Sequence, residues 1–251
     1  MVTHVYFDLD NTLYNFEEAS AKAVKATARK AYEMFGLNEK EFIDLYGEYM
    51  HKQEREAPFP NAGMHSRVLR FKMMLEYYHL PVLPYAADLS KYYWESLIKD
   101  IKPEKGLVNL LKQLKAGDYF IGLGTNMQAY PQYKKLVKLG IEGYFDGLIT
   151  SEEAAYEKPQ REFFQFILDQ DKVEADECLF LGDNIIHDVF PALEIGMRAG
   201  LYTPNLPEDR LKKYVKLAEE KGYKIKEYHG SIQDIGREPG VIHQIKNWEN
   251  L

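Results

Sequence analysis

The sequence predicts an α/β protein with a doubly wound parallel sheet, interrupted after its first strand by an all-helical insertion. Short apolar runs alternate with helical spacing along much of the chain. Strands in such an alternation pair in parallel beneath helices on both faces. From about residue 16 to 99, by contrast, helical spacing continues without a convincing strand. We therefore expect a core domain formed by residues 1–15 and 100–251, with residues 16–99 inserted as a helical domain.

Composition limits the classes of protein that remain. The chain has 251 residues, of which 45% are hydrophobic, enough for a sizeable core. A net charge of −7 argues against electrostatic nucleic-acid binding. The single cysteine, Cys178, excludes an internal disulfide. Neither a leader segment nor a membrane-spanning run is apparent. We expect a cytoplasmic monomer or homodimer that binds no nucleic acid and no membrane.

The first strand is expected at residues 4–9 and runs into two acids, Asp8 and Asp10. Residues two apart in a strand start on one face, and the following Asn11-Thr12 favours a turn. The carboxylates then leave the sheet at the carboxyl end of a buried strand, where open α/β sheets bind ligands. Taken alone, the pattern fits a strand followed by an acidic turn equally well.

The helical block is divided by turn signals. Gly36 ends a first helix, and Asn38 can cap the second. Residues 58–63, rich in proline and glycine, form a break before a third helix, and a fourth follows the turn at Pro81 and Pro84.

From Pro103 onward the α/β alternation resumes. Strands are expected at residues 119–123, 146–150, 177–181 and 198–201, with helices at residues 107–114, 129–139, 161–168 and 187–195. Parallel crossovers between them are right-handed. After Thr203 we expect an amphipathic helix near residues 211–218, an edge strand at 223–228 and a short terminal helix at 241–248.

Three later fragments follow the first acidic motif in a fixed order. They are Gly124-Thr125-Asn126, Glu157-Lys158-Pro159 and the run from Gly182-Asp183-Asn184 to His187-Asp188. Each is weak alone, but with Asp8-Leu9-Asp10-Asn11-Thr12 their order resembles that of the haloacid dehalogenase-like hydrolases. Phosphatases with an aspartate nucleophile dominate this superfamily. The resemblance covers about residues 4–203, and it implies a Rossmann-like core with residues 16–99 as a helical cap.

The resemblance assigns chemistry to the first motif. Asp8 would attack phosphorus and form an aspartyl-phosphate, which divides hydrolysis into two steps. Asp10 would protonate the leaving alcohol and then accept a proton from the attacking water. Thr12 would belong to the phosphate-binding residues, and its hydroxyl would orient Asp10.

The second and third motifs would bind the phosphoryl group. Thr125 and the amide of Asn126 would hold its oxygens, and Lys158 would place a positive charge beside them and beside Asp8. A lone Lys-Pro pair is usually a surface feature, so Lys158 takes this role only in the company of the other motifs.

The acids of the first and last motifs predict a metal site. Four carboxylates with one nearby lysine cannot all stay ionised without a cation, and a few hard oxygen ligands suit Mg²⁺. By resemblance the ligands are the Asp8 carboxylate, the Asp10 main-chain carbonyl and the Asp183 carboxylate, while Asp188 orients the metal's waters or contacts Lys158. The simpler interpretation of Asp183 and Asp188 is that of acids favoured at a helix N-terminus.

The helical block offers candidate substrate contacts in His65 and Arg70. Arg70 is expected to grip an acidic or polar substrate group remote from phosphorus. Arg67 lies three residues earlier and shares the same helix face, for which a solvated basic surface is an equally good interpretation.

The sequence thus predicts a Mg²⁺-dependent phosphatase acting on a small phosphorylated metabolite. Nucleoside monophosphates, sugar phosphates and phosphoglycolate stay open as substrates. Carbon–halogen hydrolysis is a disfavoured alternative because the dehalogenase branch lacks the acid found here at Asp10. The phosphonate-cleaving branch would need a cap lysine, for which Lys22 and Lys25 are the nearest candidates. A catalytically idle binding protein is a further alternative, against which the intact acids and lysine argue.

Overall fold

The computed structural model describes residues 1–57, 59–204 and 206–251. Within them a seven-stranded sheet has the order β3-β2-β1-β4-β5-β7-β6, and all neighbouring strands pair in parallel. The strands are β1 (His4–Phe7), β2 (Phe120–Thr125), β3 (Gly147–Thr150), β4 (Cys178–Gly182), β5 (Arg198–Tyr202), β6 (Lys224–Glu227) and β7 (Val241–Ile245). The predicted doubly wound α/β core is therefore confirmed.

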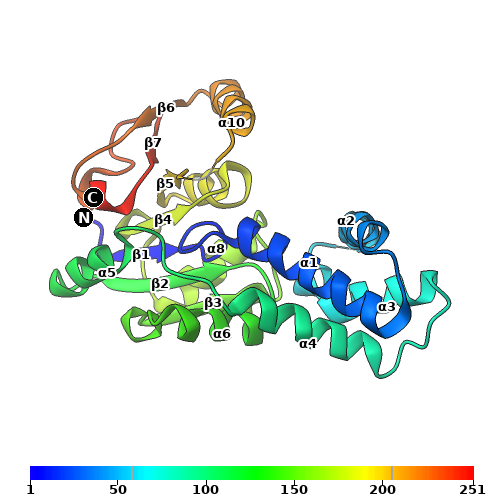
Figure 1. The fold of residues 1–251 in the computed structure, drawn as a ribbon. Coiled ribbons are helices and arrows are strands. Elements are labelled where there is room, and N and C mark those ends of the chain that lie inside the picture. Colours follow the sequence, from blue (N-terminus) through cyan, green and yellow to red (C-terminus); the bar gives the residue numbers. More distant parts are fainter. Residues whose placement is uncertain (58, 205) are drawn as a thin grey trace.

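Helices cover both faces of this sheet (Figure 1). They are α5 (Leu107–Ala116), α6 (Ala129–Leu139), α7 (Ser151–Ala154), α8 (Arg161–Asp171), α9 (Phe190–Glu194) and α10 (Glu208–Glu220). Short 3-10 segments occur at Glu142–Tyr144, Ala175–Glu177, Ile232–Asp234 and Trp248–Asn250, and a π-helical turn at Ile185–Val189 precedes α9. The helix expected at residues 187–195 thus begins as this π-helical turn.

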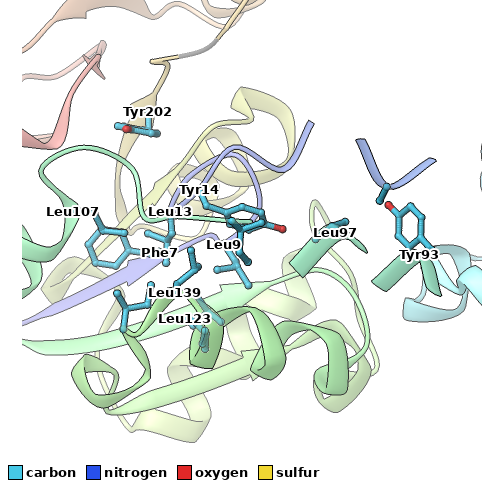
Figure 2. Packing of buried hydrophobic residues seen from close by; sticks show 14 of the residues in the cluster. Phe7, Leu9, Leu13, Tyr14, Tyr93, Leu97, Leu107, Leu123, Leu139 and Tyr202 are labelled. Carbon is cyan, nitrogen blue, oxygen red and sulfur yellow. The ribbon is translucent and has the colours of Figure 1, made fainter. Parts of the chain in front are cut away.

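The strand β1 divides the core into two layers, because successive side chains of a strand point to opposite faces. Val5 and Phe7 pack with leucines of α5 and α6, whereas Tyr6 packs with α8 and α9. Figure 2 shows Phe7 among Leu107, Leu123 and Leu139 in the first layer.

The strand order places β1 at the topological switch point of the sheet. The chain passes from β1 outward to β2 and β3 on one side, and β4 and β5 lie on the other. Phe7 pairs with Leu123 of β2 and with Leu181 of β4, so the three strands end within two residues of one another. Loops that follow such strands form the ligand crevice of open α/β sheets.

Between β1 and α5 the chain forms a group of helices that lies beyond one end of the sheet (Figure 1). We call this group the helical insert. It comprises α1 (Phe16–Phe35), α2 (Glu39–Glu56), a 3-10 turn at Ala62–His65, α3 (Arg67–Tyr77) and α4 (Tyr85–Ile98). The side chain of Asn38 caps α2, and Gly36 ends α1 with a φ of 71°, as the sequence predicted. The predicted break at residues 58–63 includes Pro58, which lies outside the described residues.

The terminal helix expected at residues 241–248 is wrong, because residues 241–245 form β7. All five of its residues are buried, and the strand lies inside the sheet between β5 and the edge strand β6. A strand buried on both faces has no polar alternation to mark it. The first strand also ends at Phe7, two residues earlier than expected.

The chain's last residues pack on the loop that follows β1. The Trp248 ring stacks on Tyr202 with centroids 3.9 Å apart and meets Phe7 edge-on at 5.7 Å. Its Nε1–H donates to the Thr12 carbonyl at 3.3 Å. Residues near the carboxyl terminus thus support the acidic loop. Over the described ranges, no helix has the length and apolar character needed to cross a bilayer.

Candidate active site

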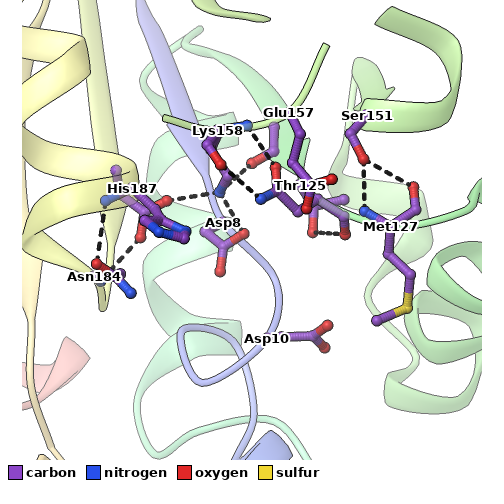
Figure 3. A network of polar contacts seen from close by, with 12 residues as sticks. Asp8, Asp10, Thr125, Met127, Ser151, Glu157, Lys158, Asn184 and His187 are labelled. Carbon is purple, nitrogen blue, oxygen red and sulfur yellow. Dashed lines mark hydrogen bonds and ion pairs between the residues drawn. The ribbon is translucent and has the colours of Figure 1, made fainter. Parts of the chain in front are cut away.

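Lys158 contacts two acids at the switch point, one of which, Asp8, is labelled in Figure 3. Its Nζ donates to Asp8 Oδ1 at 2.7 Å, to Asp188 Oδ1 at 2.6 Å and to the Gly124 carbonyl at 3.0 Å. Burial alone would lower the pKa of Lys158, but Asp188 and Asp8 outweigh burial and raise it above its ordinary value. The lysine is therefore held as a cation beside the first acid of the sequence.

Asn126, at the end of β2, fixes the backbone of Lys158. Its side-chain amide donates to the Lys158 carbonyl at 3.1 Å and accepts from the Lys158 N–H at 2.9 Å. The predicted contact of the Asn126 amide with phosphate stays a prediction. In the structure the same side chain holds the backbone of Lys158 in place. Asn126 links the end of β2 to the loop that carries the lysine.

Asp188 is held by the turn that follows β4. The Asn184 N–H donates to Asp188 Oδ2 at 2.9 Å. The Asp188 carboxyl lies so close to Gly182 that a Cβ at this glycine would come within 2.4 Å of it. Only glycine fits here, which explains the Gly-Asp pair at the strand end.

Asp8, Asp183 and Asp188 form a carboxylate cluster. One oxygen from each lies within 4.8 Å of the others. Burial first, and then Asp188 and Asp8, raise the pKa of Asp183 well above its ordinary value. Burial raises the pKa of Asp8 to about 7, and Lys158 only partly opposes this. A cluster of three carboxylates with one shared lysine has an excess of negative charge, which fits a divalent cation.

Asp10 has a different set of partners from those predicted. Lys135 Nζ donates to both carboxylate oxygens, at 2.7 and 2.8 Å, and the Tyr14 hydroxyl donates to Oδ1 at 2.6 Å. Figure 3 shows the Asp10 carboxylate turned away from Lys158. The predicted contact from the Thr12 hydroxyl is wrong, because this buried hydroxyl has no hydrogen-bond partner among the described residues.

Lys135 and Gln132, on α6, were not predicted as site residues. Gln132 donates to Thr125 Oγ1 at 2.7 Å and accepts from Lys135 at 2.6 Å, so it connects the second motif to the partner of Asp10. Both side chains are wholly buried. The sequence did indicate that Gln132 and Lys135 are buried, because they occupy the helix face that also carries Leu136 and Leu139.

The helical insert closes the site from the other side. A cavity of about 260 Å³ is lined by motif residues together with insert side chains, namely Phe16, Met50, Glu54, His65, Arg67 and Arg70. His65 is hydrogen-bonded through Nε2 to Glu157, the residue before Lys158. The Gln128 amide donates to the Ala62 carbonyl at 2.8 Å, a second contact between core and insert. Thr125, Lys158 and all four predicted acids line the same cavity.

The arginines and the lysines predicted in the insert differ in burial. Arg70 and Arg67 are both buried at this cavity, so the interpretation of Arg67 as a solvated surface is wrong. Lys22 is exposed and paired with Glu18 at 2.5 Å, and Lys25 is exposed as well. Neither lysine lines the cavity, which leaves the phosphonate-cleaving branch without its required amine.

A carboxylate cluster with a buried lysine, at the switch point of a parallel sheet and beneath a helical insert, is the arrangement of an α/β hydrolase site. The family described as haloacid dehalogenase-like hydrolase matches residues 5–201. The chain belongs to this family, and within it is a phosphoric monoester hydrolase.

Similar proteins include two archaeal phosphatases. Ribulose-1,5-bisphosphate 5-phosphatase of Halopiger xanaduensis is 29% identical over 211 residues, which cover 83% of this chain and 88% of the relative. Glyceraldehyde 3-phosphate phosphatase of Methanocaldococcus jannaschii is 32% identical over 202 residues, covering 78% and 83%. Among solved structures, the hydrolase YfnB of Bacillus subtilis, bound to magnesium, aligns with a TM-score of 0.65 at 21% identity, covering 82% of this chain and 92% of that one.

Proposed function

We propose that the protein is a Mg²⁺-dependent phosphatase that hydrolyses a small phosphorylated metabolite through an aspartyl-phosphate on Asp8. One observation carries this proposal. The Asp8 carboxylate borders the cavity with one oxygen bound to the Lys158 cation, so a carboxylate and a fixed positive charge face the same space. An attacking carboxylate needs such a charge because it approaches an anionic phosphoryl group.

Two displacements at phosphorus complete the reaction. In the first, an Asp8 oxygen forms a bond to phosphorus while the ester P–O bond breaks, and the leaving alkoxide takes a proton from Asp10. In the second, water attacks phosphorus and gives its proton to Asp10. The bond to Asp8 then breaks, which releases phosphate and the free carboxylate.

Proton transfer by Asp10 requires a change from the arrangement in the structure. Its carboxylate is paired with Lys135 and Tyr14 and is turned away from Lys158. In this proposal the side chain turns toward the leaving group once substrate is bound. Lys135 and Tyr14 thereby act as positioning residues that hold the carboxylate near the site between turnovers.

The carboxylate cluster is the proposed site of Mg²⁺. Asp8 and Asp183 would bind it through their carboxylates and Asp10 through its main-chain carbonyl, and Asp188 would orient bound water. The ion would neutralise charge on the phosphoryl group. The magnesium bound to YfnB supports this choice of metal.

The size of the cavity and the relatives support a small substrate. About 260 Å³ falls just below the range of roughly 300–1,000 Å³ that is typical of drug-sized ligands. The two similar phosphatases are named for a pentulose bisphosphate and a triose phosphate. We propose residues 16–99 as the cap that closes over this substrate, with Thr125 and Asn126 at its phosphoryl oxygens and His65 and Arg70 among the insert's contacts.

Hydrolysis of p-nitrophenyl phosphate by the purified protein tests the proposal. We expect turnover that depends on added Mg²⁺ and stops with excess chelator. Mg²⁺ should also raise the melting temperature, because a ligand that binds only the folded state stabilises it. Undiminished turnover in chelator would overturn the metal assignment. Failure to hydrolyse any phosphate ester would overturn the function in favour of an idle binding protein.

A further inference from the structure

The insert side of the cavity contains two buried arginines, Arg67 and Arg70, on successive turns of one face of α3. Their exposed fractions are 6% and 1%, and both line the cavity that holds Asp8 and Lys158. Arginine is almost never fully buried unless it is paired. Their partners are therefore informative.

Both guanidinium groups rest on aromatic rings and neutral acceptors. Arg70 Nε donates to Gln53 Oε1 at 2.7 Å, and its guanidinium lies over the Tyr46 ring, 4.8 Å from the centroid. Arg67 donates to the His65 carbonyl at 2.7 Å. The Arg67 guanidinium also lies over the rings of Tyr93 and Trp94, 5.2 and 5.0 Å from their centroids.

No carboxylate neutralises either group within the described parts of the chain. The surface arginines Arg210 and Arg237 pair with carboxylates at 2.9 and 2.8 Å, whereas the two buried ones do not. Glu54 also borders the cavity, but its carboxylate is half-exposed and lies 3.4 Å from His51 on its own helix.

Donor atoms of both arginines are left without partners. Arg67 Nε and Arg70 Nη1 are buried and have no hydrogen-bond partner in the described residues. An unmade hydrogen bond of this kind costs roughly 1–3 kcal/mol, and more for a charged group. Burial, and then the neighbouring Arg67, lower the pKa of Arg70. Burial alone would also lower the pKa of Arg67, but Tyr93, Tyr46 and Asp10 outweigh burial and raise it. Two buried guanidinium groups that have unpartnered donor atoms and no carboxylate ion pair in the described residues, beside a ligand cavity, indicate a site that the ligand completes.

We propose that Arg67 and Arg70 form a subsite for a second anionic group of the substrate, a carboxylate or a second phosphate, while Lys158 and the carboxylate cluster receive the scissile phosphate. This inference rests on the proposed phosphatase function and narrows its substrate class to small esters with two anionic ends. Two adjacent guanidinium groups offer the forked donors that carboxylate and phosphate accept.

The wild-type enzyme provides the first test, because matched esters can differ by one anionic group. 3-Phosphoglycerate has a carboxylate where glycerol 3-phosphate has a hydroxymethyl group. Propane-1,3-diol bisphosphate has a second phosphate that 3-hydroxypropyl phosphate lacks. In one of the two pairs, we expect kcat/KM to be at least about tenfold higher for the ester that carries the second anionic group. If this is the 3-phosphoglycerate pair, the subsite binds a carboxylate, and if it is the propanediol pair, the subsite binds a phosphate. Ratios near one for both pairs would overturn the subsite.

Substitution then assigns the preference to the arginines. Arg67→Met and Arg70→Met keep an unbranched side chain against the aromatic rings and remove the charge. In the pair that shows the preference, the ratio of kcat/KM with the second anionic group to kcat/KM without it should fall by about tenfold in each variant, the effect of losing roughly 1.4 kcal/mol. Arg70→Lys, which keeps a positive charge, should retain part of this preference. A purely structural role would lower both members equally and leave the ratio unchanged, which would contradict the proposal. The control is Arg29→Met, at an exposed position of α1 in the same insert, for which no change of ratio is expected.

A binding measurement separates this inference from the function on which it rests. Titration calorimetry of the Asp8→Asn protein with 3-phosphoglycerate and glycerol 3-phosphate, and with the propanediol pair, reports the second anion without turnover. Wild-type protein that hydrolyses no ester would overturn the phosphatase proposal. Hydrolysis and binding that are both indifferent to the second anion would overturn the subsite alone.

Discussion

The two sides of the cavity neutralise charge in opposite ways. On the core side, Lys158 is shared by Asp8 and Asp188, and Lys135 is paired with Asp10. On the insert side, Arg67 and Arg70 rest on aromatic rings, a carbonyl and an amide, with no carboxylate partner in the described structure. The charges on the core side are paired before substrate arrives, although Asp10 has still to turn toward the leaving group, whereas the arginines of the insert have no carboxylate partner in the described residues.

This difference assigns separate tasks to the two regions. Reactive groups need fixed geometry, and buried ion pairs supply it by satisfying each other's hydrogen bonds. Selection among substrates needs charge that only the right ligand completes, because an ester without that group leaves the cations desolvated and unpaired. Changes on the core side should therefore affect all substrates, and changes on the insert side should affect their ranking.

The largest expected effect is that of Asp8→Asn. An amide cannot act as the nucleophile, so turnover of every ester should fall by about 10⁴-fold or more. The fold should persist, because Lys158 keeps its ion pair with Asp188 at 2.6 Å. Asp169→Asn, at an exposed position of α8, is the matched control and should retain wild-type rates. Turnover by Asp8→Asn close to that of the control would disprove the covalent step.

Lys135→Met should have a smaller effect that depends on the leaving group. Removing the cation leaves Asp10 with Tyr14 and a long contact from Gln132 at 3.4 Å, so its carboxylate loses its fixed position. General acid catalysis contributes about 10²–10⁴-fold when the leaving group needs a proton. We expect a loss of about 10²-fold on alkyl phosphates and a much smaller loss on p-nitrophenyl phosphate.

The comparison of the two leaving groups distinguishes positioning from structure. Breaking a buried ion pair costs about 3–5 kcal/mol, so Lys135→Met should also lower the melting temperature. Equal losses on both kinds of ester, in protein that is fully folded at the assay temperature, would mean that Lys135 does not act through Asp10. The milder Tyr14→Phe removes only one hydrogen bond to Asp10 and should shift rates in the same direction.

The smallest effect is expected for Thr12→Val. The Thr12 hydroxyl is buried without a hydrogen-bond partner in the described structure, a cost of roughly 1–3 kcal/mol that the isosteric methyl removes. The free energy of unfolding should therefore rise by about 1 kcal/mol, as measured by urea denaturation, with kcat within about twofold of wild type. A hundredfold loss of kcat would restore the original interpretation, in which this hydroxyl orients Asp10.

The acids on the core side of the site could be predicted because the end of a strand is visible in a short stretch of sequence, and neighbouring parallel strands end at the same edge of the sheet. An apolar run that stops in an acid places that acid at the sheet edge wherever the strand lies, so Asp8 and Asp183 were predicted together. Lys158 follows no strand directly, and only the order of the motifs marked it. Contacts between distant helices have no such rule. Lys135 is 125 residues from Asp10 in the sequence, and only its place on a buried helix face marks it.

In the insert and near the carboxyl terminus, charge and hydrophobic periodicity were not enough to predict burial and secondary structure. A solvated surface was left open for Arg67 because arginine is usually exposed, but two aromatic rings of α4 bury it. β7 was predicted as a helix because five residues buried on both faces carry no period of two. In both cases the deciding contacts come from elements that are remote in the chain.

The position of β7 has a consequence for how the protein is made. β6 pairs with no strand other than β7 in the described sheet, and Trp248 donates a hydrogen bond to the carbonyl of Thr12, in the loop that carries Asp10. During synthesis, residues near the amino terminus become available first, yet the loop after β1 gains support from Trp248, which is translated 236 residues after Thr12. A ribosome-bound chain that stops before Val241 has an open edge at β5, prone to pair with other chains. The sheet and the loop after β1 are thus complete only once residues 241–248 have been synthesised.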